Sequence, residues 1–492
     1  MTNLQEVINN NLLFTRSDLK ANKGLVREIQ IKLSNLGFYP GGQWIDGDLG
    51  GLNSYTWKGL LYFCSTVGII SLPSGSVGIN QDIAKKLVET LQVNFVLDQA
   101  KDNSFILSKL KNIQDNTSIL FNPGVTVAFL TRTTSNSPVK DHINNYPTYL
   151  EHKPDGTSII SYGDSFTLST GATISFSDYP NLGKVPNIDI SGLDFLSSNI
   201  SHACVCVGSF QDSTSFIKTH WLGKKALEPQ QFLSTTKFIG VLNAICQINS
   251  QSPTTDVDNC IIESPRFRFN NLVEDMVSYQ NKFGSSNAIG ALFKRFTKRE
   301  DLESWIKDQT GNKSIEFCGA YGEDPLITNP NIQDTTTGKP VLKSTSKGKP
   351  GDNSISAYDL VRLISMLGWH KYLPETAQLP SAQWTSLESV VRAMGNDTAR
   401  YVDVAFETLG VVNVISEPVI ISKVGWGNSS MTYAAFVKFV DRRITPSKLR
   451  TFALALRCPT PASSDDRDDD RDTNLAAAVT EIVRRIITEE LA

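Results

Sequence analysis

Hydrophobic residues recur three and four positions apart in several long segments, a spacing that puts them on one face of a helix. Near the N-terminus these segments are residues 25–38, 54–69 and 80–92. Beyond residue 230 they are residues 230–249, 270–283, 287–296, 356–373 and 386–394. The first segment carries its apolar residues at Leu25, Ile29, Leu33 and Leu36, and Gly37 ends it. The pattern predicts a small helical unit at the start of the chain and a larger, helix-rich region after residue 230.

A period-two alternation, typical of strands, marks the remaining regions. Short alternating runs occupy residues 125–130, 157–162, 165–170 and 172–177. Longer apolar runs cover 203–210, 214–223, 418–427, 431–441 and 449–457. A charged stretch, predicted to be a solvated loop, spans residues 465–472 and leads to a last helix over 474–491, capped by Thr473 or Asn474.

These elements predict an α+β protein in three parts. Residues 1–100 form a helical module, residues 101–200 a β-rich linking region, and residues 201–492 a domain in which helices flank an antiparallel sheet.

Charge and hydropathy exclude several classes of protein. The chain has 47 Lys and Arg against 50 Asp and Glu, so it lacks the overall positive field of a nucleic-acid-binding protein. No apolar run approaches the roughly 18 residues of a transmembrane helix. Residues 1–18 lack the basic and apolar regions of a conventional secretory signal peptide. We therefore expect no nucleic-acid partner and no membrane span, and either a cytoplasmic location or export without such a signal.

The seven cysteines do not form a disulfide framework, and no cluster predicts a metal site. His202, Cys204 and Cys206 share one face of a predicted strand, where buried core residues are expected. A second group, in the loops of the β-rich region, is expected to be solvated and comprises Asp141, His142, Glu151 and His152. The sequence thus predicts neither a metal nor a cofactor.

A Gly-rich loop joins the first two predicted helices. Residues 26–38, followed by Asp46-Gly47-Asp48-Leu49-Gly50, resemble the peptidoglycan-binding-like module, a three-helix domain. Residues 51–53 depart from that family, which usually has Pro and Thr there. The resemblance implies peptidoglycan or its peptides as a partner. The alternative is a helical spacer without glycan affinity.

The strongest candidate for catalysis is Ser234-Thr235-Thr236-Lys237, at the head of an apolar helix. A serine needs a base to become a nucleophile. A lysine three residues later lies on the same face, and burial lowers its pKa so that it can accept the serine proton. The helix N-terminus also directs backbone N–H groups toward the site.

Two further motifs follow in order. Ser285-Ser286-Asn287 lies between two predicted helices, and Lys423-Val424-Gly425 lies on a predicted strand that is followed by two more strands and a helix. This order of S-x-x-K, S-x-N and K-(T/S)-G motifs resembles the penicillin-binding protein and serine β-lactamase superfamily. The resemblance covers about residues 200–492 and implies a β-lactamase/transpeptidase-like fold.

The resemblance also implies roles for individual residues. Ser234 is the nucleophile that forms the acyl-enzyme, Lys237 its general base, and Ser285 the relay of a proton to the leaving group. Asn287 holds the substrate amide and Lys237, while Lys423 attracts a substrate carboxylate and tunes Ser285.

The same resemblance implies an oxyanion hole from the backbone N–H groups of Ser234 and Trp426, and substrate contacts at Val424 and Gly425. Val424 departs from the family, which usually has a hydroxyl there to bind a terminal carboxylate. An internal peptide bond or an ester therefore becomes the favoured substrate.

Three residues near these motifs have a simpler interpretation. Ser285 could cap the following helix instead of relaying a proton. Glu323 lies in a segment between the motifs, but no motif supports it as a deacylating base. His370 is expected at a helix end.

Three functions fit the sequence. The first is an active-serine acyl hydrolase on peptidoglycan-type peptides, a DD-peptidase or β-lactamase-like enzyme. The second is a degenerate penicillin-binding fold that only binds. The third is an intracellular amidase, esterase or acyltransferase with a substrate outside the cell wall.

Overall fold

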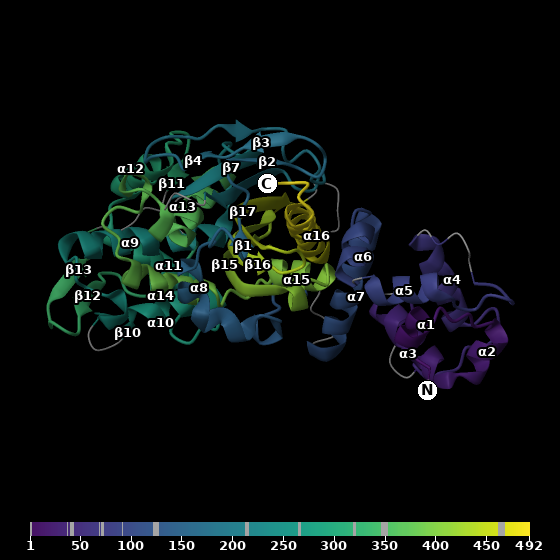
Figure 1. The fold of residues 1–492 in the computed structure, drawn as a ribbon. Helices are drawn as coiled ribbons and strands as arrows, with labels where there is room; N and C mark the ends of the chain where they lie inside the picture. Colours follow the sequence, from purple (N-terminus) through teal and green to yellow (C-terminus); the bar gives the residue numbers. More distant parts are fainter. Residues whose placement is uncertain are drawn as a thin grey trace. The chain divides into compact units, whose positions relative to one another are not determined.

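A computed structural model describes residues 2–492 except residues 37, 40–43, 68, 70–72, 91, 122–126, 212–215, 264–266, 318–320, 346–352 and 461–467. Gly37, part of the Gly-rich loop and residues 465–467 of the charged stretch therefore lie outside the described residues. The chain divides into two compact units, Met1–Asp102 and Asn103–Ala492 (Figure 1).

The first unit is entirely helical where it is described. Its helices are α1 (Leu4–Asn9), α2 (Arg16–Ala21), α3 (Lys23–Asn35), α4 (Tyr55–Thr66), α5 (Gln81–Glu89) and α6 (Gln92–Gln99). The three predicted helices correspond to α3, α4 and α5, and the predicted apolar face of α3 is buried. The short helices α1 and α2 were not predicted, because each depends on its cap: Asn3 accepts from Glu6 N, and Thr15 and Asp18 form a capping box.

A buried glutamine organises the loop between α3 and α4. The Gln30 side chain donates to Asp46 Oδ1 at 2.9 Å and accepts from Gly47 N at 2.8 Å. Gly47 has a φ of 79°, and a Cβ there would lie 2.7 Å from the carbonyl oxygen of Lys23. The Asp-Gly pair thus fixes this turn against the start of α3.

The second unit is built on an 8-stranded sheet whose main path runs β15-β16-β17-β6-β7-β4. The strands are β15 (Ile415–Gly427), β16 (Ser430–Asp441), β17 (Ser447–Pro459), β6 (His202–Phe210), β7 (Ile217–Lys224), β4 (Ser177–Asp178), β1 (Ile159–Ile160) and β5 (Ile188–Asp189). Neighbours along the main path pair antiparallel, whereas β1 and β5 add parallel to β17 and β7. The predicted antiparallel sheet flanked by helices is confirmed.

Helices cover both faces of this sheet (Figure 1). One face packs on α13 (Ala357–Gly368), and the other packs on α16 (Asp468–Ile487), which in turn contacts α15 (Tyr401–Thr408) and α7 (Asn103–Phe121). Ile421 of β15 belongs to the core shared with α13. Since side chains alternate along a strand, Lys423 and Gly425 face the same side as Ile421.

The remaining elements surround the α13 side. The helices are α9 (Lys237–Gln251), α10 (Phe269–Ser278), α11 (Ser286–Phe293), α12 (Arg299–Thr310) and α14 (Trp384–Met394). Two small sheets have the orders β10-β9-β12-β13 and β11-β14-β8. Their strands are β8 (Gln230–Gln231), β9 (Cys260–Ile262), β10 (Phe267–Arg268), β11 (Glu316–Phe317), β12 (Asn331–Asp334), β13 (Pro340–Lys343) and β14 (Asn353–Ile355).

Only part of the predicted β-rich region is strand. Besides β1, β4 and β5 it contains the hairpin of β2 (Ser165–Thr167) and β3 (Thr173–Ser175), and two helices, α7 and α8 (Tyr146–Glu151). The strand predicted over residues 125–130 is wrong where it is described, because residues 128–131 form a turn. Phe129 N and Leu130 N donate to the carboxylate of Asp472, at 2.8 and 3.0 Å, rather than to a neighbouring strand.

The predicted start of the last helix is also wrong. α16 begins at Asp468, so Thr473 and Asn474 lie inside the helix and do not cap it. Asp472, predicted to be solvated, is buried, and burial raises its pKa to about 7. The Asp472 carboxylate accepts hydrogen bonds from Phe129 N, from Leu130 N and, at 2.7 Å, from Tyr401 Oη. These bonds compensate for the burial of the carboxylate.

Candidate active site

Ser234 lies in a tight turn directly before α9. The turn is the 3₁₀ helix η4 (Leu233–Thr236), and Lys237 is the first residue of α9. Residues three apart eclipse each other in a 3₁₀ helix, so Ser234 and Lys237 project from the same side. Leu233 has a φ of 51°, a conformation that costs energy for a branched residue and that clusters at functional sites. The backbone thus presents Ser234 at a strained turn, half-buried.

The edge strand β15 fixes this turn from the side. A Cβ on Gly425 would lie 2.7 Å from the carbonyl oxygen of Phe232 and 2.9 Å from the backbone nitrogen of Thr235. Thr432 of β16 donates to the same Phe232 oxygen at 2.8 Å, and its Oγ1 lies 2.7 Å from Thr235 Oγ1. Gly425 is therefore required for close packing of β15 on the serine turn.

Lys237 is buried, and its amine nitrogen is held by two neutral oxygen atoms. Its Nζ donates to Ser286 Oγ at 2.8 Å and to Asn287 Oδ1 at 2.7 Å, both at the start of α11. The pKa of Lys237 is lowered to about 6, mainly by burial and secondly by the positive charge of Lys423, while Glu323 opposes the shift. At neutral pH the amine is mostly unprotonated and can act as a base.

The second lysine is bound by a tyrosine that the sequence analysis missed. Lys423 Nζ donates to Tyr279 Oη at 2.7 Å and to the Val424 carbonyl at 3.0 Å, while Tyr279 Oη donates to that carbonyl at 3.2 Å. The ring centroid of Tyr279 is 4.1 Å from Lys423 Nζ and 5.6 Å from Lys237 Nζ. Tyr279 thus contacts both lysines.

Tyr279 takes this position because α10 ends there. Its φ of 55° and ψ of 27° are left-handed. The carboxylate of Asp275 accepts from Lys282 N and Phe283 N, at 2.9 and 2.8 Å, and so folds the following residues back. The prediction that a helix continues to residue 283 is wrong for this reason. A buried aspartate in the last turn of the helix is the one local signal for the stop.

Ser285 and Glu323 form a second group beside the lysines. Ser285 caps α11 by accepting from Ala288 N at 3.1 Å, and its hydroxyl donates to Glu323. Asn287 Nδ2 also donates to Glu323, at 3.2 Å. The structure therefore brings Asn287 to Lys237, and Ser286 rather than Ser285 receives the other Lys237 bond.

Trp426 lies beside the serine turn with its side chain 52% exposed. Gly425 and Gly427, on either side of Trp426, both approach the turn. A Cβ on Gly427 would lie 3.3 Å from Leu233 Cδ1. β15 is the edge strand of the sheet path, so one of its edges faces away from β16. The oxyanion hole from the N–H groups of Ser234 and Trp426, and the substrate contact at Val424, stay predictions.

The other candidate groups lie away from this site or in the core. Cys204 and Cys206 are buried, as predicted, and burial raises the pKa of both thiols. His370 lies in the 3₁₀ turn that follows α13, stacked on Trp384, and burial lowers its pKa to about 4. In the described part of the chain, no cluster of His, Cys, Asp and Glu could hold a metal ion. The helices described there are all too short or too polar to span a membrane.

Comparisons with known proteins give only distant similarity. No protein-family model matches the chain, and no curated protein matches it. A solved β-lactamase from Desulfarculus baarsii is 13% identical, covers 58% of this chain and 92% of its own, and has a TM-score of 0.36. β-Lactamases from Chitinophaga pinensis and Xanthomonas campestris are each 11% identical, with TM-scores of 0.34 and 0.33. They cover 59% and 58% of this chain, and 94% and 91% of their own chains.

Proposed function

We propose that the protein is an active-serine acyl hydrolase that forms an acyl-enzyme at Ser234. The observation that carries this proposal is Lys237, a buried amine with a pKa lowered to about 6, one 3₁₀ turn after the serine. Burying a lysine is costly, because its charged form loses solvation. At Lys237 the same loss of solvation lowers the pKa, so the amine is a base that is active at neutral pH.

In the proposed reaction, Lys237 Nζ accepts the Ser234 hydroxyl proton as Oγ bonds to the substrate carbonyl carbon. Ser286 and Asn287 orient the amine through the two bonds at 2.8 and 2.7 Å. When the tetrahedral intermediate collapses, the bond to the leaving nitrogen or oxygen breaks and that atom takes the proton. Water then attacks the ester and releases Ser234, with Lys237 again accepting a proton.

We assign the relay of the proton to the leaving group to Tyr279. Its hydroxyl is held by Lys423 at 2.7 Å and its ring lies 5.6 Å from Lys237 Nζ. Ser285, for which this role was predicted, has its hydroxyl directed to Glu323 and to the start of α11. Lys423 supplies the positive potential of the site whether Tyr279 or Ser285 relays the proton.

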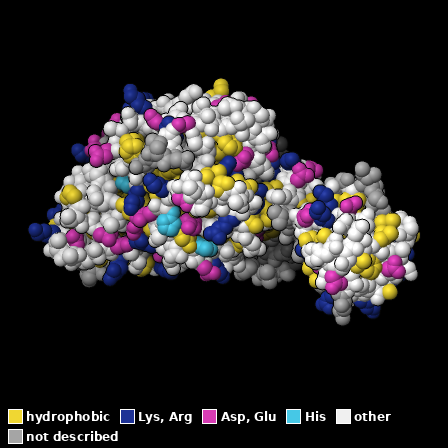
Figure 2. Space-filling view, viewed as in Figure 1, with side chains coloured by type: hydrophobic (Ala, Val, Ile, Leu, Met, Phe, Trp, Pro, Cys, Tyr) yellow, Lys and Arg dark blue, Asp and Glu magenta, His cyan; other side chains and the backbone are white. Residues whose placement is uncertain are grey.

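The proposed substrates are peptidoglycan-type peptides, cleaved at an internal amide, or related esters. Val424 offers no hydroxyl to a terminal carboxylate, which favours an internal bond over a free C-terminus. The N-terminal module would hold the enzyme near its substrate and raise the local substrate concentration. Near its Gly-rich loop, Trp44 and Tyr55 are exposed, with ring centroids 6.0 Å apart. Hydrophobic side chains reach the surface of this unit at several places (Figure 2).

Covalent labelling tests the hydrolase. The protein is incubated with a fluorescent penicillin, a peptide thioester and a fluorophosphonate, and any adduct is mapped by mass spectrometry. We expect an adduct on Ser234 with at least one probe and its loss in Ser234→Ala. Failure of all three probes with folded protein supports the alternative of a fold that only binds.

A sacculus pull-down tests the partner separately. We expect Trp44→Ala and Tyr55→Ala to reduce binding of the full chain to purified sacculi several-fold. Leu13→Ala is the control, since Leu13 is similarly exposed on the same unit. Equal binding by all four proteins contradicts the targeting role and favours an amidase or esterase with a substrate outside the wall.

A further inference from the structure

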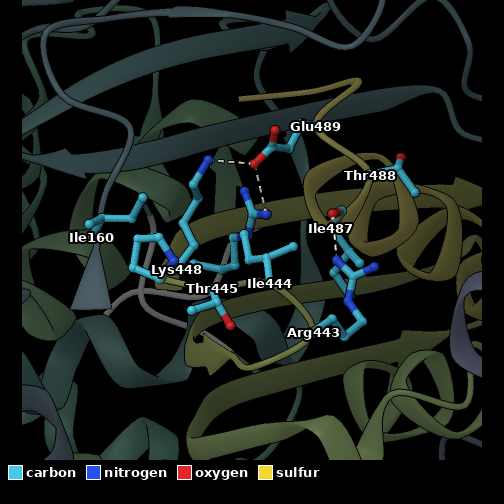
Figure 3. A pocket seen from close by; sticks show the side chains of 10 residues that line it. Ile160, Arg443, Ile444, Thr445, Lys448, Ile487, Thr488 and Glu489 are labelled. Carbon is cyan, nitrogen blue, oxygen red and sulfur yellow. Dashed lines mark hydrogen bonds and ion pairs between the residues drawn. The ribbon is translucent and has the colours of Figure 1, made fainter. Parts of the chain in front are cut away.

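A cavity lies at the other end of the sheet from the serine. It has a volume of about 350 Å³ and lies between the β16–β17 connection and the residues that follow α16 (Figure 3). On β16, Asp441 pairs with Lys448 at this end, whereas Thr432 pairs with Gly425 at the serine end. Nine residues of strand separate them, which corresponds to about 30 Å. The cavity is therefore a separate place in the fold.

Three cations line this cavity. Arg443 pairs with Asp441 at 2.7 Å, and Arg450 pairs with Asp441 at 3.4 Å and with Glu489 at 3.0 Å. Lys448 pairs with the same Glu489 oxygen at 2.5 Å, and Figure 3 shows these two side chains joined. Among the described residues, these ion pairs join two carboxylates to three cations, an excess of one positive charge.

The donors of this cluster are not all used. The Arg450 side chain is 1% exposed, and its Nε has no hydrogen-bond partner among the described residues. Its other nitrogens bind Tyr162 Oη at 2.8 Å and the two carboxylates. The unused Nε is itself buried, so it is the excess positive charge of the cluster that favours the entry of one further anion.

The rest of the lining is apolar. Ile160, Ile444 and Ile487 border the cavity around the charged group (Figure 3). The volume is at the lower end of the range of small-molecule sites, about 300–1,000 Å³. Apolar walls and a single unbalanced charge fit a ligand with one negative charge and a short hydrocarbon part better than a strongly hydrated dianion.

We propose that this cavity binds an organic monocarboxylate with a short apolar chain. The carboxylate lies against Lys448 and the arginines, and the chain lies along the isoleucines. This proposal does not depend on the activity at Ser234.

Calorimetric titration of the full chain tests it, with sodium acetate, sodium hexanoate and sodium phosphate at equal ionic strength. We expect hexanoate to bind at least 5-fold more tightly than acetate, and phosphate to bind more weakly than hexanoate. Equal or tighter binding of phosphate overturns the choice of a carboxylate, and no binding of any of the three overturns the site.

Variants locate the binding. Arg443→Met and Lys448→Met should each weaken hexanoate binding at least 5-fold, while Lys307→Met, which removes a partly buried Lys–Glu pair on α12, should not change it. Glu489→Gln should tighten binding at least 3-fold, a gain that mere damage to the fold would not produce. Ile444 is 37% exposed, so Ile444→Ala should leave the fold intact and weaken hexanoate binding more than acetate binding. Unchanged binding in Arg443→Met and Ile444→Ala contradicts the proposed position.

Discussion

Buried lysines lie near both ends of the central sheet, but their amine groups have different hydrogen-bond partners. At the serine end, Lys237 donates to a hydroxyl and an amide oxygen. At the other end, Lys448 donates to the carboxylate of Glu489. Burial lowers the pKa of both lysines, but at Lys448 the bond to Glu489 opposes the shift. A neutral partner leaves a lysine free to lose its proton, and an acidic partner keeps the charge.

This difference supports the two proposed roles, Lys237 as a general base and Lys448 in structure and anion binding. Lys423, the neighbour of Lys237, adds a like charge, whereas Arg450, the neighbour of Lys448, shares a carboxylate with it.

Lys237→Met should lower the rate of Ser234 acylation by about 10²–10⁴-fold, because it removes the general base. The measurement is the labelling rate with the best of the three probes at pH 7.5. Lys448→Met is the matched control and should change that rate less than 3-fold. Equal losses in both variants would contradict the contrast.

Tyr279→Phe should lower turnover by about 10–100-fold, since the proton relay is lost while the ring remains. Acylation by an activated probe with a good leaving group should change less, because such a group needs no proton. Ser285→Ala is the comparison. If Ser285→Ala causes the larger loss of turnover, the relay belongs to Ser285, as the sequence analysis predicted.

Lys423→Met should move the pH dependence of acylation to higher pH. Burial is the main cause of the low pKa of Lys237, and the charge of Lys423 is the second. Removing that charge favours the protonated amine, so the pKa of Lys237 rises, by about 0.5–1 unit. A shift to lower pH would show that Lys423 does not act on Lys237 through its charge.

The two lysines should also affect stability in opposite directions, by about 1–3 kcal/mol each at pH 7. Lys237→Met should raise the free energy of unfolding, because the folded protein no longer has to keep an amine neutral. Lys448→Met should lower it, because Glu489 and Arg450 lose a shared partner. Urea denaturation measures both values, and a loss of stability in both variants would contradict this expectation.

Stability should also depend on pH through Lys237. Its folded pKa of about 6 lies below the ordinary 10.5, so the unfolded state binds more protons between these values. The contribution of Lys237 to stability therefore becomes more favourable as the pH rises through this window. Lys237→Met should lack that part of the pH dependence.

The sequence predicted the parts of the site that lie within regular elements. Ser234 lies directly before an apolar helix that Lys237 begins, and Lys423 and Gly425 lie on a strand, so the spacing within each pair determines its relative positions. The antiparallel sheet and its flanking helices were predicted from the same periodicities.

The parts it missed depend on side-chain contacts that hydrophobic periodicity does not record, several of them between distant segments. The apolar pattern continues past Tyr279, but the Asp275 carboxylate ends α10 there and Lys423 binds the tyrosine hydroxyl. Asp472 lies in an acidic run typical of a solvated loop, yet it binds Phe129 and Leu130 at the other end of the unit's sequence. Local patterns do not contain such partners.

The pH dependence of Ser234 acylation is the direct test of Lys237 as the general base. The labelling rate is measured from pH 4.5 to 10, and the site of the adduct is confirmed by mass spectrometry at each end of the range. We predict one adduct, on Ser234, with a rate that rises through an apparent pKa near 6 and is constant above pH 8. A rate that keeps rising through pH 9–10, or an adduct on another residue, would contradict the account.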